Sequence, residues 1–138
     1  MLALTITQHG GTAVLTLDLP GEPVNKLSAQ VKTEFEAAFA RLKSDPAVQA
    51  VVVISGKADN FIAGADLEEI KGFSTREEFT RLAREGQEML QMVDDFPKPV
   101  IAAINGACLG GGLELTLACD WRVATDHPKT QLGLPEVQ

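Results

Sequence analysis

Hydrophobic and polar positions alternate over two short segments at the start of the chain. Apolar side chains occupy every second position in residues 2–6 and again in residues 13–17. Residues 9–12, which contain two glycines, lie between these segments. A period of two around a glycine-containing turn predicts a β-hairpin. The apolar runs at residues 50–55 and 100–104 predict strands that are buried on both faces.

The spacing of apolar residues changes to three and four after Ser28, which is a good helix N-cap. Val31, Phe35, Phe39 and Leu42 follow one face of a helix. This pattern predicts an amphipathic helix that ends at the next proline.

A second long helix is predicted after residues 74–77, which have the spacing of a capping box. Its apolar face consists of Phe79, Leu82, Gly86, Met89, Leu90 and Val93. Shorter helices are predicted at residues 66–70, with Asp66 near the cap, and from residues 110–112 onward.

The sequence of residues 121–125 predicts one more short strand. We expect Trp121, at the start of this strand, to lie in the core. The resulting order is β-β-α-β-α-α-β-α-β, and alternation of this kind favours an α/β fold. The length of 138 residues fits one domain or part of one.

Composition narrows the classes of function. The chain carries 12 Lys and Arg against 19 Asp and Glu, a net charge of −7. This balance disfavours nonspecific binding to nucleic acid or to anionic membranes, which needs a basic face. No apolar run is long enough to span a bilayer, and the first residues lack the pattern of a signal peptide. We therefore expect a cytoplasmic protein with no membrane span and no nucleic-acid partner.

The usual metal ligands and nucleophiles are scarce. Two cysteines, Cys108 and Cys119, and two histidines, His9 and His127, are separated in sequence. They make neither a disulfide framework nor a four-ligand zinc site by themselves. We expect no metal site and a buried Cys108, so carboxylates and backbone groups must carry most of any reaction.

The most informative feature is the glycine triplet at residues 110–112, which follows a buried strand and opens a helix. Glycines allow close approach of a ligand, and free N–H groups at a helix N-terminus favour negative charge. Such a place binds a phosphate or stabilises an oxyanion, although tight packing of strand against helix explains a triplet about as well. Gly112 is not followed by the Lys of a P-loop, and Leu115 stands where a dinucleotide fingerprint needs its third glycine. Oxyanion binding therefore fits better than polyphosphate binding.

Residues 63–66 form a second turn of small residues that enters a helix. Two such turns, each offering a main-chain N–H, can converge on one carbonyl oxygen. A simple helix cap at Asp66 is the plainer interpretation, and it does not exclude this one.

Glu114 and Glu136 are the candidate carboxylates, and each lies in an apolar stretch of sequence. Acidic residues in such stretches usually reach solvent or a partner. Two neighbouring carboxyl groups can divide the roles of acid and base. The sequence alone leaves open whether these two meet.

Several motifs occur in order along the chain. They are Pro-Val-Asn-Lys-Leu-Ser at residues 23–28, Asn-Phe-Ile-Ala-Gly-Ala-Asp-Leu at 60–67, Lys-Pro-Val-Ile-Ala-Ala-Ile-Asn-Gly at 98–106, Gly-Gly-Gly-Leu-Glu-Leu at 110–115 and Leu-Gly-Leu-Pro-Glu at 132–136. In this order they resemble the motifs of the crotonase (enoyl-CoA hydratase/isomerase) superfamily. Residues 60–66, 106–114 and 128–138 resemble more narrowly the N-terminal part of the alpha subunits of multifunctional fatty-acid oxidation complexes. The resemblance covers essentially the whole chain.

This resemblance implies a crotonase-like spiral of ββα units and a coenzyme A thioester substrate. Carried over by motif, the amides of Ala65 and Gly111 form an oxyanion hole. Glu114 and Glu136 become the carboxylates that act on water in the hydration of 2-enoyl thioesters to 3-hydroxyacyl thioesters. The residues implied to contact the substrate are Val24, Ala63, Gly64, Asp66, Leu67 and Gly110.

Proteins of the family that the chain resembles have further segments beyond the part that residues 1–138 match. The family continues with a glycine-rich loop and C-terminal helices, and the alpha subunits add an NAD-dependent dehydrogenase domain. We therefore expect a domain truncated at its C-terminus, with apolar faces exposed, and no cofactor in this chain. NAD is expected only for the dehydrogenase domain, and an oligomer with a thiolase subunit only for the full-length relative. Two alternatives stay open: a noncatalytic acyl-CoA-binding or assembly remnant, and a 3-enoyl-CoA isomerase, which needs one acid.

Overall fold

The computed structural model describes residues 1–137, and their strands form two sheets. The larger sheet has the order β1 (Leu4–His9), β2 (Thr12–Leu17), β3 (Ala50–Ser55), β5 (Val100–Ile104) and β7 (Trp121–Ala124). Only the β1–β2 pair is antiparallel in this sheet. The smaller sheet consists of β4 (Asn60–Ile62), β6 (Ala107–Leu109) and β8 (Gln131–Gly133), all parallel. These sheets confirm the predicted α/β class.

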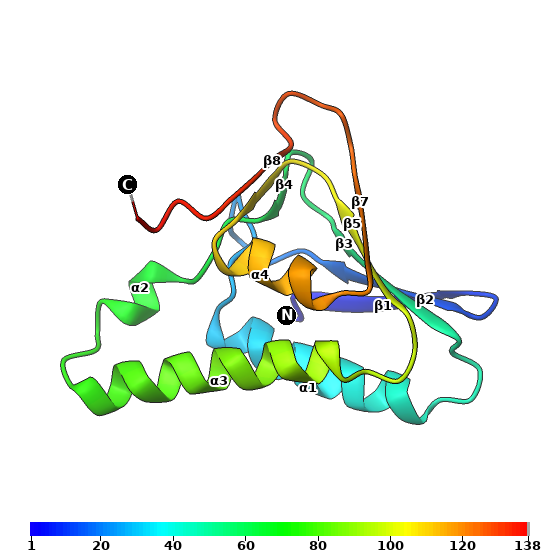
Figure 1. Cartoon of the computed structure of the whole chain (residues 1–138), viewed down its shortest axis with the longest axis horizontal. Coiled ribbons are helices and arrows are strands. Elements are labelled where there is room, and N and C mark those ends of the chain that lie inside the picture. The colour runs from blue at the N-terminus through cyan, green and yellow to red at the C-terminus, as the bar shows by residue number, and fades with distance from the viewer. Residues whose placement is uncertain (138) are drawn as a thin grey trace.

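The described part of the chain contains four helices. They are α1 (Ala29–Ser44), α2 (Leu67–Ile70), α3 (Arg76–Asp94) and α4 (Gly111–Ala118). Helix α3 contacts α1 on one side and α4 on the other, and α4 also contacts β4 and β6 (Figure 1). Helix α2 lies beside the N-terminal half of α3 (Figure 1). The space between α2, α3 and α4 is where the candidate site lies.

Side-chain caps start both long helices. Ser28 accepts a hydrogen bond from the Val31 amide at the start of α1, as the sequence predicted. At α3 the capping box joins Thr75 to Glu78, so the prediction for residues 74–77 is wrong by one position. Thr75 has the extended backbone of an N-cap, and the Glu78 carboxylate returns to its amide.

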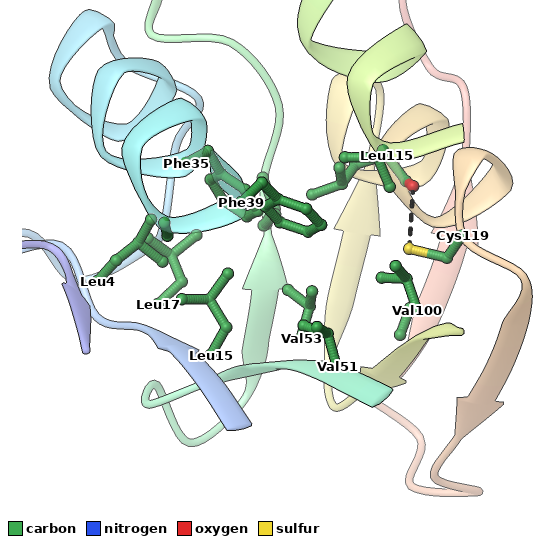
Figure 2. Close-up of a cluster of buried hydrophobic side chains, with 14 of the residues drawn as sticks. Leu4, Leu15, Leu17, Phe35, Phe39, Val51, Val53, Val100, Leu115 and Cys119 are labelled. Atoms are coloured by element: carbon green, nitrogen blue, oxygen red, sulfur yellow. Dashed lines mark hydrogen bonds between the residues drawn. The ribbon is translucent and has the colours of Figure 1, made fainter. Parts of the chain in front are cut away.

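The core lies between α1 and the larger sheet. Phe35 and Phe39 of α1 point toward Leu15 of β2 and Val53 of β3 (Figure 2). The rings of Phe35 and Phe39 are stacked with centroids 5.8 Å apart, and Phe96 meets Phe39 edge-on at 5.0 Å. In this cluster, the apolar face of α1 is buried against the apolar face of the larger sheet.

The prediction that Trp121 lies in the core is wrong. Its side chain is 70% exposed, and all residues of β7 are exposed. The reason is that, in residues 1–137, β7 is the edge strand of the larger sheet and pairs only with β5.

The sequence also missed the smaller sheet. Strands β4 and β6 lie at residues 60–62 and 107–109, where the sequence analysis predicts no strand. No strand was predicted at β8 either. Each of these strands has three residues, which is too short for a period of two to show.

Candidate active site

Asn25, in the connection between β2 and α1, organises one side of the site. Its side chain is completely buried. It bonds to Leu17 O, Leu19 N, Ser55 Oγ and Phe61 O. Its own amide donates to Asn60 Oδ1 at 2.8 Å. One residue therefore ties together the ends of β2 and β3 and the strand β4.

The turn after β4 is held against this connection. The Ala63 amide donates to Asn25 O at 2.8 Å, and the Leu27 amide donates to Gly64 O at 2.8 Å. Gly64 has a φ of +115°, which favours glycine. The Ala65 amide takes no part in these bonds, and Leu27 pairs with Ala65 in a parallel bridge. The turn thus fixes the position of Ala65 through backbone contacts.

The glycine triplet begins α4 and serves two purposes. A Cβ on Gly112 would lie 2.4 Å from the Ile62 carbonyl oxygen, so this glycine lets α4 pack on β4. Gly110, with a φ of +56°, precedes the helix and provides no side-chain cap. The first amides of α4 therefore lack a side-chain acceptor, and the helix dipole adds partial positive charge there.

The turn after β4 and the glycine turn before α4 lie next to each other because β4 pairs with β6. A Cβ on Gly64 would lie 3.6 Å from the Leu109 carbonyl oxygen. Ala65 and Gly111 line one cavity of about 350 Å³, together with Glu114 and residues of α2 and α3. Two residues that are distant in sequence therefore line one concave site.

The two candidate carboxylates approach the site differently. Both are exposed. Glu114 lies in the first turn of α4 and lines the cavity. Glu136 is not part of that cavity wall in the described residues. Its Oε2 atom lies where a side chain on Gly110 would be, 2.6 Å from the Cβ position. The structure thus brings Glu136 to the glycine turn beside the cavity.

The other residues implied to contact the substrate lie partly in the cavity wall and partly outside it. Asp66 lines the cavity and caps α2 by accepting from the Glu68 amide at 3.1 Å. The predicted contacts outside the described cavity wall are Val24, Ala63, Gly64, Leu67 and Gly110. Of these, Gly64 and Gly110 shape the two turns.

The apolar side of α3 supplies cavity residues that sequence reasoning did not assign to a site. Phe79, Leu82, Gly86 and Leu90 all line the cavity. Their helical spacing was visible in the sequence, but that spacing is the same for a core face. The sequence analysis also assigned no role to Asn25. Its place in the motif at residues 23–28 is the one signal that could have indicated its role in organising the site.

The cysteines are not placed to act as nucleophiles. Burial raises the pKa of Cys108 to about 11 and that of Cys119 to about 12. Both thiols are therefore protonated at neutral pH, and the predicted burial of Cys108 is confirmed.

In residues 1–137, no three His, Cys, Asp or Glu side chains gather as a metal site would require. No helix in the same range has the length and apolar character to cross a bilayer.

Comparison with known proteins identifies the family. The sequence profile described as enoyl-CoA hydratase/isomerase matches residues 7–138. The chain belongs to this family. It is 52% identical over 126 residues to the fatty acid oxidation complex subunit alpha of Vibrio campbellii, covering 91% of this chain.

Solved structures agree with this assignment and confirm the crotonase-like fold. An enoyl-CoA hydratase from Bacillus anthracis has a TM-score of 0.89 at 31% identity, covering 97% of this chain and 51% of that one. DspI of Pseudomonas aeruginosa has a TM-score of 0.87 at 35% identity, covering 97% of this chain and 53% of that one. The chain spans 18% of the length of the Vibrio relative.

Proposed function

We propose that this chain binds coenzyme A thioesters of 2-enoic acids and supplies the groups that hydrate them to 3-hydroxyacyl thioesters. The proposal rests on the observation that Ala65, Gly111 and Glu114 line the same cavity. Membership of the enoyl-CoA hydratase/isomerase family supports the choice of substrate class.

The two amides act on the thioester carbonyl. When its oxygen accepts hydrogen bonds from Ala65 and Gly111, the enoyl group is polarised for attack at C3. Negative charge then develops on that oxygen as an enolate, so fixed donors stabilise the transition state more than the bound substrate. The N-terminus of α4 adds to this effect. Loss of one such donor typically raises the barrier by about 3 kcal/mol.

The carboxylates act on water and on C2. One, ionised, takes a proton from water as the water oxygen bonds to C3, and the other, in its protonated carboxylic acid form, donates a proton to C2 as the enolate collapses. Return of the proton from the first group to the second restores the starting state. Glu114 faces the cavity, and Glu136 contacts the turn that begins α4. These two positions support the assignment of both glutamates to the reaction at the start of α4.

A second candidate, 3-enoyl-CoA isomerisation, is favoured by the difference between these two glutamates. Glu114 lines the cavity and Glu136 does not in the described residues. A single carboxylate suffices for isomerisation, because it can take a proton from C2 and return it to C4 while the double bond moves.

Hydration of crotonyl-CoA, followed by loss of enoyl-thioester absorbance, tests the proposal. Glu114→Gln and Glu136→Gln should each lower the rate by roughly 100-fold or more, while binding of butyryl-CoA stays the same. Glu88→Gln, an exposed change on α3, is the control and should leave both unchanged.

Three outcomes contradict this assignment in different ways. Normal hydration in either glutamate variant refutes the two-carboxylate mechanism. Isomerisation of a 3-enoyl thioester that depends on Glu114 alone supports the second candidate. Binding of butyryl-CoA without any turnover supports a noncatalytic acyl-CoA-binding chain.

We also propose that this chain acts in an assembly, as the name of the Vibrio relative, a complex subunit, suggests. A thiolase subunit is the proposed partner. Light scattering of the chain alone and mixed with a thiolase measures both self-association and the heteromeric complex.

A further inference from the structure

We propose that Gly86, in the middle of α3, determines how long an acyl chain the cavity accepts. The proposal rests on the proposed function, because it assumes that the thioester carbonyl lies at Ala65 and Gly111. It adds the place of the acyl chain and the residue that leaves room for it.

Gly86 has neither of the usual reasons for a glycine inside a helix. Glycine destabilises a helix interior relative to alanine, and α3 extends ten residues before this position and eight after it. The φ of Gly86 is not positive. A Cβ built on it would meet nothing within 4 Å, whereas one on Gly112 would collide with the Ile62 carbonyl. Close packing therefore explains Gly112 and does not explain Gly86.

The open space at Gly86 belongs to the candidate site. Gly86 lies one helical turn from both Leu82 and Leu90, and the three residues share one face of α3. All three line the cavity that also contains Ala65 and Gly111. The absence of a side chain at position 86 thus enlarges this cavity along α3.

The two sides of the cavity have different chemistry. The side formed by α1 and α2 carries the charged residues Lys32, Asp66 and Glu69. In residues 1–137, the side formed by α3 carries no charged residue, its apolar members Leu82, Ala83 and Leu90 outnumber the polar Gln87, and Phe79 on it is 46% exposed. An apolar chain attached to the thioester carbonyl gains most by lying along α3, where it covers exposed apolar surface.

A larger side chain at position 86 should therefore exclude long acyl chains and spare short ones. The variants are Gly86→Leu and Gly86→Ala. The matched control is Arg84→Leu, which adds the same leucine to α3 outside the cavity wall. Thermal unfolding verifies folding, and both glycine variants should be at least as stable as the unmodified chain, because glycine is the poorer helix former.

Calorimetric titration with butyryl-CoA and with decanoyl-CoA measures the effect. Gly86→Leu should weaken decanoyl-CoA binding by roughly 10-fold or more, within the range that one or two methylenes contribute in an apolar pocket. Binding of butyryl-CoA should change by less than about 2-fold on the same scale. Gly86→Ala should have an intermediate effect, and Arg84→Leu should change neither ligand.

The result that overturns the inference is distinct from failure of the proposed function. Equal weakening of both ligands would place the shared coenzyme A part, not the acyl chain, at Gly86. Unchanged binding of decanoyl-CoA would show that the chain lies elsewhere. If the unmodified chain binds neither thioester, the proposed function fails and this inference fails with it.

Discussion

Helices α1 and α3 have similar lengths, 16 and 19 residues, and each carries an apolar face, yet they use these faces differently. Helix α1 buries Val31, Phe35, Ala38, Phe39 and Leu42. Helix α3 buries only Met89 and Val93, near its C-terminal end. The N-terminal half of its apolar face lines the cavity instead.

This difference shows that a helical apolar period has two possible uses. Along α1 it contributes stability, because sheet residues fill the space opposite each side chain. Along α3 it leaves apolar surface in a cavity, where a ligand can cover it. Substitutions on α1 should therefore change folding, and substitutions on α3 should change binding.

The sharpest test compares one phenylalanine on each helix. Phe35→Ala should cost about 3–5 kcal/mol of the free energy of unfolding, because Phe35 is fully buried. Phe79→Ala should cost about 1 kcal/mol or less, since this ring makes an edge-on contact with Phe73 and is half exposed. Urea unfolding of both variants measures this.

Acyl-CoA binding gives the converse comparison for the same pair. Decanoyl-CoA affinity should fall in Phe79→Ala, which removes cavity wall. Similar losses of stability in the two variants would refute the distinction between the helices.

Asn25 connects the stable region to the cavity and should show both effects. Asn25→Ala leaves the buried Leu19 amide and Phe61 carbonyl without their partner. We expect a loss of at least about 2 kcal/mol in the free energy of unfolding, with weaker butyryl-CoA binding because the turn at Ala65 loses support. The measurements are urea unfolding and calorimetry.

Asn105→Ala is the matched control for Asn25. Asn105 is half-buried, and its Nδ2 donates to Lys57 O, but its Oδ1 has no partner in residues 1–137. Its replacement should cost only about 1 kcal/mol. Equal effects of the two substitutions would remove the special role of Asn25.

The helix caps should differ by a smaller amount. Ser28→Ala and Thr75→Ala should each cost about 1 kcal/mol, with the larger loss at Ser28, because it is buried and Thr75 is exposed. Urea unfolding quantifies both. A larger loss at Thr75 would mean that the α3 end contributes more to folding than its exposure suggests.

The smallest effect concerns pH and the start of α3. Hydrogen bonds from the amides of Ser74 and Thr75 hold the pKa of Glu78 below its ordinary value of 4.5. Because the folded-state pKa is lowered, the carboxylate stabilises the cap above pH 4.5. This contribution disappears as the pH falls through the folded-state pKa.

Amide hydrogen exchange at the start of α3 measures this pH dependence. Protection should exceed that of Glu78→Gln at neutral pH, and the two chains should converge in acid. A constant difference across the titration would show that ionisation of Glu78 does not matter.

Local signals explain which parts of the fold could be predicted. The hairpin, the two long helices and the strands β3 and β5 follow from apolar spacing and from caps such as Ser28, which depend on neighbours in sequence. The three-residue strands of the smaller sheet lack such a signal. They form because α4 and the adjacent strands hold them in place.

The candidate site was predictable in its chemistry but not in its geometry. The sequence by itself determined two small-residue turns, each with amides to offer, and two glutamates near them. Only the tertiary structure decided that Ala65 and Gly111 share a cavity, that Glu114 faces it while Glu136 lies beside Gly110, and that α3 lines it with apolar surface. The physical reason is that amide availability follows from local backbone conformation, whereas a shared cavity depends on the pairing of β4 with β6 and on which helix faces remain uncovered.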